Sequence, residues 1–438
     1  MKVSVIGVGY VGIITAVSLA ELGHNVLGMD DNKEKVKSFS KGISPIYEEG
    51  LEEALNKNIK EGTLSFTDSI EVAISHGEVI FICVGTPSLP GGKADLSFVE
   101  RVAREIAKNA KEYKLIVEKS TVPVKTSEQI LKTIKLYNKH GVELEVASNP
   151  EFLREGTALQ DFFEADRIVI GVSSKKAENL FRELYKGIDS PIVVTDPNTA
   201  EIIKHASNSF LAMKISFINM VADLCENTGA DINKVAEGMG FDKRIGKSFL
   251  NAGIGYGGSC FPKDVRAFNQ IGKENGLDFS LLKDVDKINI ERVERFISKL
   301  RKAHWVFKDK VFSLWGLAFK PGTDDIREAP ALKVMEILLN EGAILRVYDP
   351  KAMENVKKIF PPTEKLYYAQ DPYDAAKDSE AILLITEWDE FKSIDFSKIK
   401  DMILTNVLID GRNLYSPKKM KEEGFIYYPV GKPPIEEI

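Results

Sequence analysis

Residues 3–12 read VSVIGVGYVG, a run of β-branched residues that leads directly into a turn with glycines at positions 7, 9 and 12. A GxGxxG turn between a strand and a helix is typical of dinucleotide-binding domains. Gly7 would permit the tight turn, Gly9 would let a diphosphate approach the backbone, and Gly12 would let the helix pack on the strand. Tyr10 and Val11 open the helix, where backbone N–H groups attract phosphates. The stretch therefore predicts a cofactor turn.

Asp30 indicates which dinucleotide would bind. It ends the next predicted strand, 18 residues after Gly12. An acid at this position binds the ribose 2′-hydroxyl of NAD and repels the 2′-phosphate of NADP, and Asp31 adds to the repulsion. Lys35 could neutralise part of this charge or be an ordinary exposed lysine. Glycine-rich turns also close βα units that bind nothing, but the acid in this context favours NAD as the cofactor.

Outward from the turn, short β-branched runs alternate with helical patterns, which predicts a parallel sheet with crossover helices. From Thr199 a single long helix is expected, because roughly thirty residues follow without proline or interior glycine. We therefore expect an α/β fold with two Rossmann-like doubly wound domains, at 1–198 and 302–438, joined by a long central helix and a helical region at 199–301. The expected strands are 3–7, 25–30, 79–84, 115–120, 144–148, 167–171 and 192–195, then 310–316, 344–349, 381–386, 407–410 and 425–430.

Composition argues against several classes of protein. The chain has 438 residues, a net charge of −6 and no long basic run, so no nucleic-acid surface is expected. No uninterrupted apolar run reaches roughly 18 residues and no leader pattern opens the sequence, so no membrane association is expected. Three widely spaced cysteines predict neither a disulfide framework nor a zinc cage, and no motif predicts another metal site. We expect a cytoplasmic protein with reduced thiols.

One cysteine stands in an unusual setting, the stretch GYGGSCFPKD at 255–264. Cys83 and Cys225 fit apolar positions of a strand and a helix, but Cys260 follows a glycine-rich turn. Gly257 and Gly258 would leave room for a substrate, and Lys263 supplies the positive charge that favours a reactive thiol. The alternative is a buried cysteine in a Gly/Pro loop.

Two other stretches favour the catalytic interpretation. Lys204 and Asn208 are four residues apart on the long helix, so they share a face and could hold an oxyanion. Alternatively, Lys204 extends to solvent and Asn208 pairs locally. In SNPEFLREG (148–156), Glu151 and Glu155 could act as bases or position water, although a solvated loop would also explain them. No histidine lies in these stretches except His205, which points to another helix face than Lys204, so a Cys–His dyad is not expected.

Taken together, these stretches resemble the nucleotide-sugar dehydrogenase family, whose members act on UDP-glucose, GDP-mannose and related sugars. The resemblance implies an NAD-binding domain, a central helical dimerisation region and a C-terminal UDP-binding domain, in the order expected above. It runs nearly end to end. The matching segments are GVGYVG (7–12), CVGTP (83–87), KSTVPVKT (119–126), SNPEFLREGTALQDF (148–162), DRIVIG (166–171), KHASNSFLAMKISFIN (204–219), GYGGSCFPKD (255–264) and GLAFKPGTDDIREAP (316–330).

The resemblance also implies a reaction: four-electron oxidation of UDP-glucose to UDP-glucuronate with two NAD⁺. Cys260 would attack the C6 aldehyde, and oxidation of the thiohemiacetal would give a thioester that water hydrolyses. Lys204 and Asn208 would stabilise the C6 oxyanion, and Asp264 would order a water and assist proton transfer. Thr121, Glu151 and Glu155 would surround the reacting carbon, with Glu151 as a candidate base for hydrolysis.

The same resemblance implies the ligand contacts. The cofactor would also touch Lys35, Thr86, Thr121, Glu155, Lys263 and Arg327. The sugar nucleotide would touch Glu151, Phe152, Leu153, Arg154, Glu155, Lys204, Asn208, Phe249, Leu250, Asn251, Ala252, Gly253, Gly257, Cys260 and Lys320. Arg244 would reach the substrate of the partner subunit in a homodimer.

Three alternatives stay open. The substrate could be GDP-mannose or another hexose nucleotide of the same family. GDP-mannose enzymes share NPEFLREG, but they usually have leucine after the catalytic cysteine, whereas this chain has Phe261, the form common in UDP-glucose enzymes. A two-electron hydroxyacid dehydrogenase would share the fold and the cofactor turn but would not need Cys260. A silent nucleotide-binding protein could lose Cys260, Lys204, Asn208 or Asp264 without penalty, yet all four are present.

Overall fold

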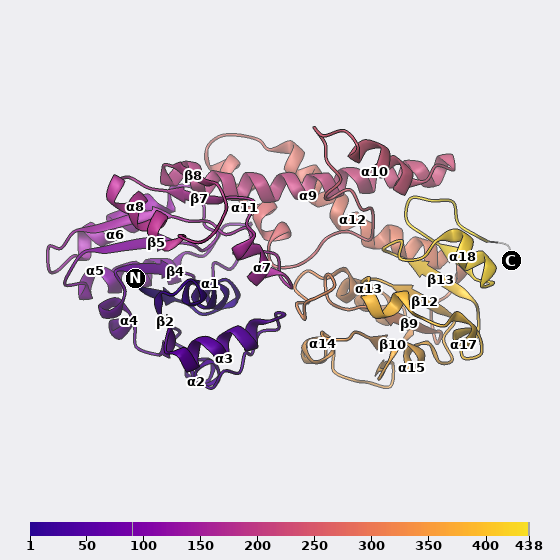
Figure 1. Ribbon diagram of the computed structural model, residues 1–438. Coiled ribbons are helices and arrows are strands. Elements are labelled where there is room, and N and C mark those ends of the chain that lie inside the picture. Colours follow the sequence, from indigo (N-terminus) through magenta and orange to yellow (C-terminus); the bar gives the residue numbers. More distant parts are fainter. Residues whose placement is uncertain (90, 437–438) are drawn as a thin grey trace. The chain divides into compact units, whose positions relative to one another are not determined.

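Two doubly wound sheets organise the chain, whose computed structural model describes residues 1–89 and 91–436 (Figure 1). One sheet belongs to a unit formed by residues 1–207 and 270–277, and the other to a unit formed by 208–269 and 278–438. Helix α9 (Pro197–Thr228) and helix α11 (Phe261–Glu274) contribute residues to both units.

The sheet of the first unit has eight strands in the order β3-β2-β1-β4-β5-β6-β7-β8. Neighbouring strands are parallel except β6 and β7, which pair antiparallel through Ser148 and Gly171. The strands are β1 (Lys2–Ile6), β2 (Asn25–Met29), β3 (Leu64–Thr67), β4 (Val79–Ile82), β5 (Lys114–Glu118), β6 (Leu144–Ser148), β7 (Ile168–Gly171) and β8 (Ile192–Thr195). The helices are α1 (Tyr10–Glu21), α2 (Lys33–Ser40), α3 (Leu51–Glu61), α4 (Ile70–His76), α5 (Ser97–Asn109), α6 (Thr126–Tyr137), α7 (Ala158–Phe163) and α8 (Lys175–Leu184).

The central strands of this sheet are buried on both faces. Val79 and Phe81 of β4 contribute to one apolar cluster, and the alternate residues Ile80 and Ile82 contribute to another. Successive side chains of a strand point to opposite faces, so each face has its own core, covered by helices. This arrangement explains why β4 reads as a continuous apolar run.

The second unit contains a six-stranded parallel sheet in the order β11-β10-β9-β12-β13-β14. Counted along the chain this is the order 3-2-1-4-5-6, as in the first six strands of the other sheet, and it is the Rossmann order. The strands are β9 (Val311–Trp315), β10 (Ile344–Tyr348), β11 (Leu366–Tyr368), β12 (Ala381–Leu384), β13 (Val407–Asp410) and β14 (Ile426–Tyr428). The remaining helices are α10 (Ile232–Gly240), α12 (Ser280–Ala303), α13 (Pro330–Asn340), α14 (Met353–Ile359), α15 (Pro372–Ala376), α16 (Asp389–Lys392), α17 (Phe396–Lys400) and α18 (Pro417–Glu422).

The expected fold class is confirmed, with two corrections to the strand assignment. Strands β3 and β11 were not predicted, because they are short edge strands and only Leu64 and Leu366 in them are buried. The first sheet is also not wholly parallel, because the chain reverses between Ser148 and Gly171. The connection between these residues carries the NPEFLREG stretch.

Asp349 occupies in the second sheet the place that Asp30 has in the first, immediately after the second strand of the Rossmann order. Its carboxylate accepts hydrogen bonds from the backbone of Leu317, Ala318, Lys351 and Ala352 at 2.7–3.0 Å and from Trp388 Nε1 at 3.0 Å. Asp349 is 1% exposed. All of these donors are groups of the protein itself, not of a ligand. Asp349 therefore organises the turn after β9.

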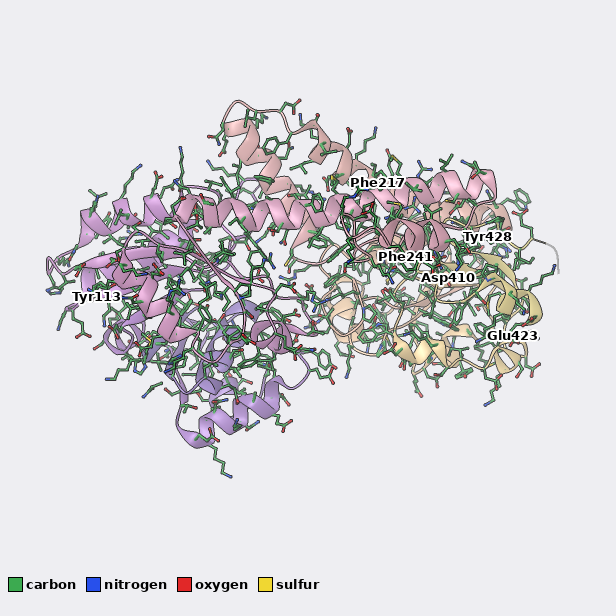
Figure 2. All side chains as sticks on the ribbon, turned by 45° about the horizontal axis from the view of Figure 1, so that its top comes forward. Tyr113, Phe217, Phe241, Asp410, Glu423 and Tyr428 are labelled. Atoms are coloured by element: carbon green, nitrogen blue, oxygen red, sulfur yellow. The ribbon has the colours of Figure 1, made fainter. Side chains whose placement is uncertain are left out.

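Helix α9 exposes an apolar stripe in the second unit. The stripe consists of Phe210, Phe217, Met220 and Leu224, which are 44–62% exposed and follow one face of a helix. Figure 2 labels Phe217 and Phe241, the residue after α10, whose exposed fraction is 67%. Across the described ranges no helix is both long and apolar enough to span a membrane.

Candidate active site

The turn at 7–12 has three glycines for three different reasons. Gly7 has φ +93°, and a Cβ there would lie 2.8 Å from the carbonyl oxygen of Cys83. A Cβ on Gly12 would lie 1.9 Å from the carbonyl oxygen of Gly7, so helix and strand could not pack. A Cβ on Gly9 would meet nothing within 4 Å, which leaves space directly before the first amides of α1. This is the geometry that a dinucleotide diphosphate requires.

Asp30 and Lys35 form a half-buried ion pair beyond the end of β2. Lys35 Nζ lies 2.8 Å from Asp30 Oδ2, and the amide of Asn32 donates to Asp30 Oδ1 at 3.0 Å. Asp31 pairs on the surface with Arg101 of α5 at 3.0 Å. The acid expected to bind a ribose therefore lies at the predicted edge, next to the lysine proposed to accompany it.

Thr86 connects two loops at this edge of the sheet. Its hydroxyl donates to the carbonyl oxygen of Thr121 at 2.8 Å, which links the loop after β4 to the loop after β5. Carboxyl ends of neighbouring parallel strands are where open α/β sheets bind ligands. Both predicted cofactor contacts thus lie at the binding edge.

The NPEFLREG loop places Glu151 against Lys204 of α9. Lys204 Nζ donates to Glu151 Oε1 at 2.8 Å and to its carbonyl oxygen at 2.7 Å, while the amide of Leu153 donates to Oε2 at 2.6 Å. Both side chains are buried. Lys204 therefore does not extend to solvent, and it is paired with a residue that was proposed separately as a base.

The charge state of Glu151 follows from this contact. Burial by itself would raise the pKa of Glu151, but the ammonium of Lys204 and its hydrogen bonds outweigh burial and hold the pKa below its ordinary value. Lys119 contributes in the same direction. Glu151 is thus an ionised carboxylate at neutral pH, able to accept a proton.

Lys119 holds the start of the same loop and was not singled out from the sequence. Its Nζ donates to Asn149 Oδ1 at 3.1 Å and to the carbonyl oxygen of Asn149 at 3.3 Å. Tyr185 also donates to Asn149 Oδ1. Burial lowers the pKa of Lys119 to about 8. Its position in KSTVPVKT, directly after a strand end, was a usable signal.

The remaining residues of the loop divide into buried and exposed members. Phe152 packs its ring under the guanidinium of Arg167, with 3.6 Å between the group and the ring centre, and Glu155 is buried. Arg154 is exposed and forms an ion pair of 2.5 Å with Asp161. A substrate contact by Arg154 would compete with that pair.

In the second unit, Cys260 immediately precedes α11. Its carbonyl oxygen accepts the amide of Asp264 at 2.8 Å, so Cys260 caps the helix, and its Sγ lies 3.6 Å from Ser259 Oγ. Cys260 is a partly exposed residue, whereas Cys83 and Cys225 are buried. A helix N-terminus favours negative charge, and partial exposure allows a substrate to reach the sulfur.

Asn208 and Asp264 pair beside this helix start. Asn208 Nδ2 donates to Asp264 Oδ2 at 2.6 Å, with both side chains buried. Asp264 Oδ1 is buried and has no hydrogen-bond partner within the described part of the chain, and Lys263 Nζ lies 3.9 Å from it. The pair leaves one carboxylate oxygen available as an acceptor.

The glycines before Cys260 have a different role from the one expected. We expected Gly257 and Gly258 to leave room for a substrate. A Cβ on Gly257 would lie 2.3 Å from the carbonyl oxygen of Glu328, and one on Gly258 would lie 2.7 Å from the Phe319 ring. The protein itself fills this space, so these glycines let the cysteine loop pack on the 319–328 segment.

The FLNAG stretch is held by two buried side chains. Asn219 Oδ1 accepts the amide of Gly253 at 2.8 Å, and Arg292 Nε donates to the carbonyl oxygen of Gly253 at 3.2 Å. Leu250 and Ala252 are buried, Asn251 is exposed, and Phe249 has φ +64°. Only part of the stretch can therefore contact a ligand through side chains.

Two predicted arginines lie on the surface beside acids of their own unit. Arg244 is 89% exposed and pairs with Asp242 at 2.6 Å, and Arg327 is 61% exposed and pairs with Asp325 at 2.6 Å. In residues 1–89 and 91–436, no group of three or more His, Cys, Asp and Glu side chains could hold a metal ion.

Family models match the chain in three consecutive segments. They are the NAD-binding domain of the UDP-glucose/GDP-mannose dehydrogenase family at residues 1–189, its central domain at 198–291 and its UDP-binding domain at 313–417. The chain belongs to this family. It is an NAD-dependent oxidoreductase, and the NAD-binding domain contains the turn at 7–12 and Asp30.

Named relatives extend over nearly the whole chain. UDP-glucose 6-dehydrogenase TuaD from Bacillus subtilis is 42% identical over 99% of this chain and 94% of its own length. UDP-glucose 6-dehydrogenase from Rhizobium meliloti is 43% identical over 99% of this chain and 100% of its own length. A solved UDP-glucose dehydrogenase from Pyrobaculum islandicum is 40% identical, with a TM-score of 0.92 over 99% of this chain and 98% of that chain.

Arg412, in the UDP-binding domain, is a residue that sequence reasoning missed. Its Nη1 donates to the carbonyl oxygen of Gly255 at 3.0 Å and its Nη2 to that of Phe319 at 3.4 Å, beside Lys320. It thereby ties the cysteine loop to the loop after β9. Its position two residues after the end of β13 was a usable signal, because loops at strand ends carry ligands.

Proposed function

We propose that this chain oxidises UDP-glucose to UDP-glucuronate in two oxidations followed by hydrolysis, through a thiohemiacetal and then a thioester on Cys260. The observation that carries the proposal is the partly exposed Cys260 at the start of α11, next to the buried Asn208–Asp264 pair. Relatives named UDP-glucose 6-dehydrogenase, similar over their whole length, support the same reaction.

The chemistry balances with two NAD⁺ and one water. The 7–12 turn, Asp30 and Lys35 would hold NAD⁺, which would supply the hydride acceptor for each oxidation. The first oxidation would convert the C6 alcohol to an aldehyde. Cys260 Sγ would then attack the aldehyde carbon and form a C–S bond, giving a thiohemiacetal that the second oxidation converts to a thioester. Water then adds to the carbonyl carbon, the C–S bond breaks, and the thiolate leaves with the carboxylate as product.

Asn208 and Asp264 would act on the oxygen of C6. The amide of Asn208 is fixed by its bond to Asp264 and is a neutral donor for a developing oxyanion. Asp264 Oδ1 would hold a water and assist proton transfer, and its buried position supports this role.

Lys204 and Glu151 would act as an acid–base pair. Lys204 lies one helical turn before Asn208 on α9, so it can donate to the same oxyanion. Glu151, ionised by Lys204, would take the proton of the attacking water. Thr121 would orient the substrate beside this pair.

Two features favour UDP-glucose over GDP-mannose. Relatives named UDP-glucose 6-dehydrogenase are 42–43% identical to this chain, whereas a solved GDP-mannose dehydrogenase is 30% identical. Phe261 also follows the cysteine, as in UDP-glucose enzymes. We assign Lys320 and the FLNAG stretch to the sugar nucleotide. The three cysteines carry reduced thiols, which fits a reducing cytoplasm.

We also propose a homodimer. The apolar stripe of α9 (Phe210, Phe217, Met220 and Leu224) lies along one face of the helix, and a second copy would cover it. Arg244 would reach the substrate of the partner subunit after exchanging its bond to Asp242.

The decisive experiment measures NADH formed per UDP-glucose consumed, in the wild type and in Cys260→Ser, with GDP-mannose in parallel. We expect two NADH per sugar and a serine variant that stalls. One NADH per sugar, or full turnover by Cys260→Ser, would exclude the thioester route. Turnover of GDP-mannose alone would keep the mechanism and change the substrate.

A further inference from the structure

Glu48 is a buried carboxylate that the proposed chemistry does not use. It lies in the loop between α2 and α3 and is 6% exposed, whereas the next residue, Glu49, is exposed. Acidic side chains are rarely this buried unless donors surround them.

Three donors converge on Glu48. The amide of Ala158 donates to Oε1 at 2.6 Å, and the amide of Gly156 donates to Oε2 at 2.7 Å. Tyr10 Oη also donates to Oε2. All four residues belong to the first unit.

These donors come from the two segments that the reaction needs together. Tyr10 is the first residue of α1 and follows the glycine turn that holds the cofactor. Gly156 closes the loop at 149–156, which carries Glu151 and Glu155, and Ala158 begins α7. Glu48 accepts hydrogen bonds from both segments, so it links the start of α1 to these two amides.

We propose that Glu48 is a positioning residue, which fixes the 149–156 loop relative to the cofactor turn. The inference rests on the proposed role of that loop in the reaction. Burial and the contact with Glu48 both raise the pKa of Tyr10, so the phenol keeps its proton and remains a donor.

The position requires a carboxylate. The two side-chain oxygens of Glu48 both act as acceptors here, and they meet three donors. In Glu48→Gln, an NH₂ group replaces one of the two carboxylate oxygens. In one orientation of the amide this NH₂ group would face the backbone N–H of Ala158, and in the other it would face Tyr10 and the backbone N–H of Gly156. At least one buried donor would then lose its acceptor.

The test compares Glu48→Gln with Glu49→Gln, which removes the same charge from the exposed neighbour. Calorimetry gives the dissociation constants of NAD⁺ and UDP-glucose, and steady-state assays give kcat and KM. For Glu48→Gln we expect kcat to fall and NAD⁺ binding to weaken by roughly 10- to 100-fold, as for an unsatisfied buried donor. Glu49→Gln should stay within about twofold.

A second variant separates positioning from folding. Tyr10→Phe removes one donor from the same link, so Tyr10→Phe/Glu48→Gln should bind NAD⁺ no more weakly than Glu48→Gln alone. Additive losses, or equal behaviour of Glu48→Gln and Glu49→Gln, would overturn the proposal.

If Glu48→Gln does not fold, Tyr10→Phe by itself tests the proposed positioning role. It should weaken binding of UDP-glucose as well as NAD⁺, because the loop loses part of its anchor, and an effect on NAD⁺ alone would refute the link. A failure of the proposed function would show separately, as undiminished turnover by Cys260→Ser.

Discussion

Asn208 Nδ2 lies 2.6 Å from Asp264 Oδ2, and this contact orients a buried carboxylate without neutralising it. A hydrogen bond to a charged acceptor is stronger than one between neutral groups, so the carboxylate has one preferred orientation. Its other oxygen then points in a fixed direction beside the start of α11.

Asp264→Asn tests the chemistry without breaking the pair. An asparagine at 264 can still accept from Asn208, so the free energy of unfolding should change by about 1 kcal/mol or less. Because an amide cannot take a proton, kcat should fall by about 10²-fold or more. Steady-state assays and urea unfolding on the same samples check both. A variant with wild-type kcat would remove Asp264 from proton transfer.

Lys204→Met tests the buried ion pair. Removing the ammonium leaves Glu151 buried and unpaired, which should cost about 3–5 kcal/mol of stability at pH 7. The pKa of Glu151 is lowered in the fold, so the wild type has this stability above the unfolded pKa and loses it as pH falls through the folded value.

Unfolding curves at pH 7 and near pH 4 should therefore show a smaller difference between wild type and Lys204→Met at the acid end. Lys175→Met, which removes an exposed lysine that pairs with Glu178, is the control and should cost much less stability. An equal cost for the two variants at pH 7 would contradict a buried pair.

Gly9→Ala and Gly12→Ala should separate binding from folding. The Cβ introduced by Gly12→Ala would overlap the carbonyl oxygen of Gly7, so this variant should lose at least about 2 kcal/mol of stability. The Cβ introduced by Gly9→Ala meets no protein atom within 4 Å, so Tm should hardly move while NAD⁺ binding weakens. Calorimetry and thermal unfolding measure the two quantities. Similar Tm values for both variants would count against the packing argument.

Phe217→Asp should shift the oligomer. A charge in the apolar stripe of α9 would be buried in the proposed interface, so sedimentation should show the monomer at concentrations where the wild type is a dimer. Trp305→Asp is the control, since Trp305 is 91% exposed but lies outside α9. An unchanged sedimentation coefficient for Phe217→Asp would place the interface elsewhere.

The sequence was most informative where a pattern has one physical cause. The turn at 7–12, Asp30 and the central strands were predicted because glycine spacing, a strand-end acid and apolar runs are local signals. Edge strands such as β3 and β11 were missed because half-exposed short strands lack such runs.

The site was predicted as a set of residues but not as a set of contacts. Lys204 and Glu151 were assigned separate roles, and their pairing joins residues 53 positions apart in the chain. No sequence pattern pointed to Glu48. Its partners Gly156 and Ala158 contribute only backbone amides, which leave no signal in the sequence. The glycines at 257 and 258 were noticed, but their reason lies in Phe319 and Glu328, which only the tertiary structure identifies.

Asp30 and Asp349 occupy the same position in two sheets of the same strand order. The effects of substitutions at these two positions should nevertheless depend differently on the concentration of NAD⁺. A ligand that binds only the native state restores its population by mass action, so if Asp30 binds the ribose of NAD⁺ as proposed, excess NAD⁺ should compensate for a substitution at Asp30. The donors around Asp349 belong to the chain itself, and no added metabolite can replace them. Excess NAD⁺ should therefore restore function after substitution of Asp30 but not after substitution of Asp349.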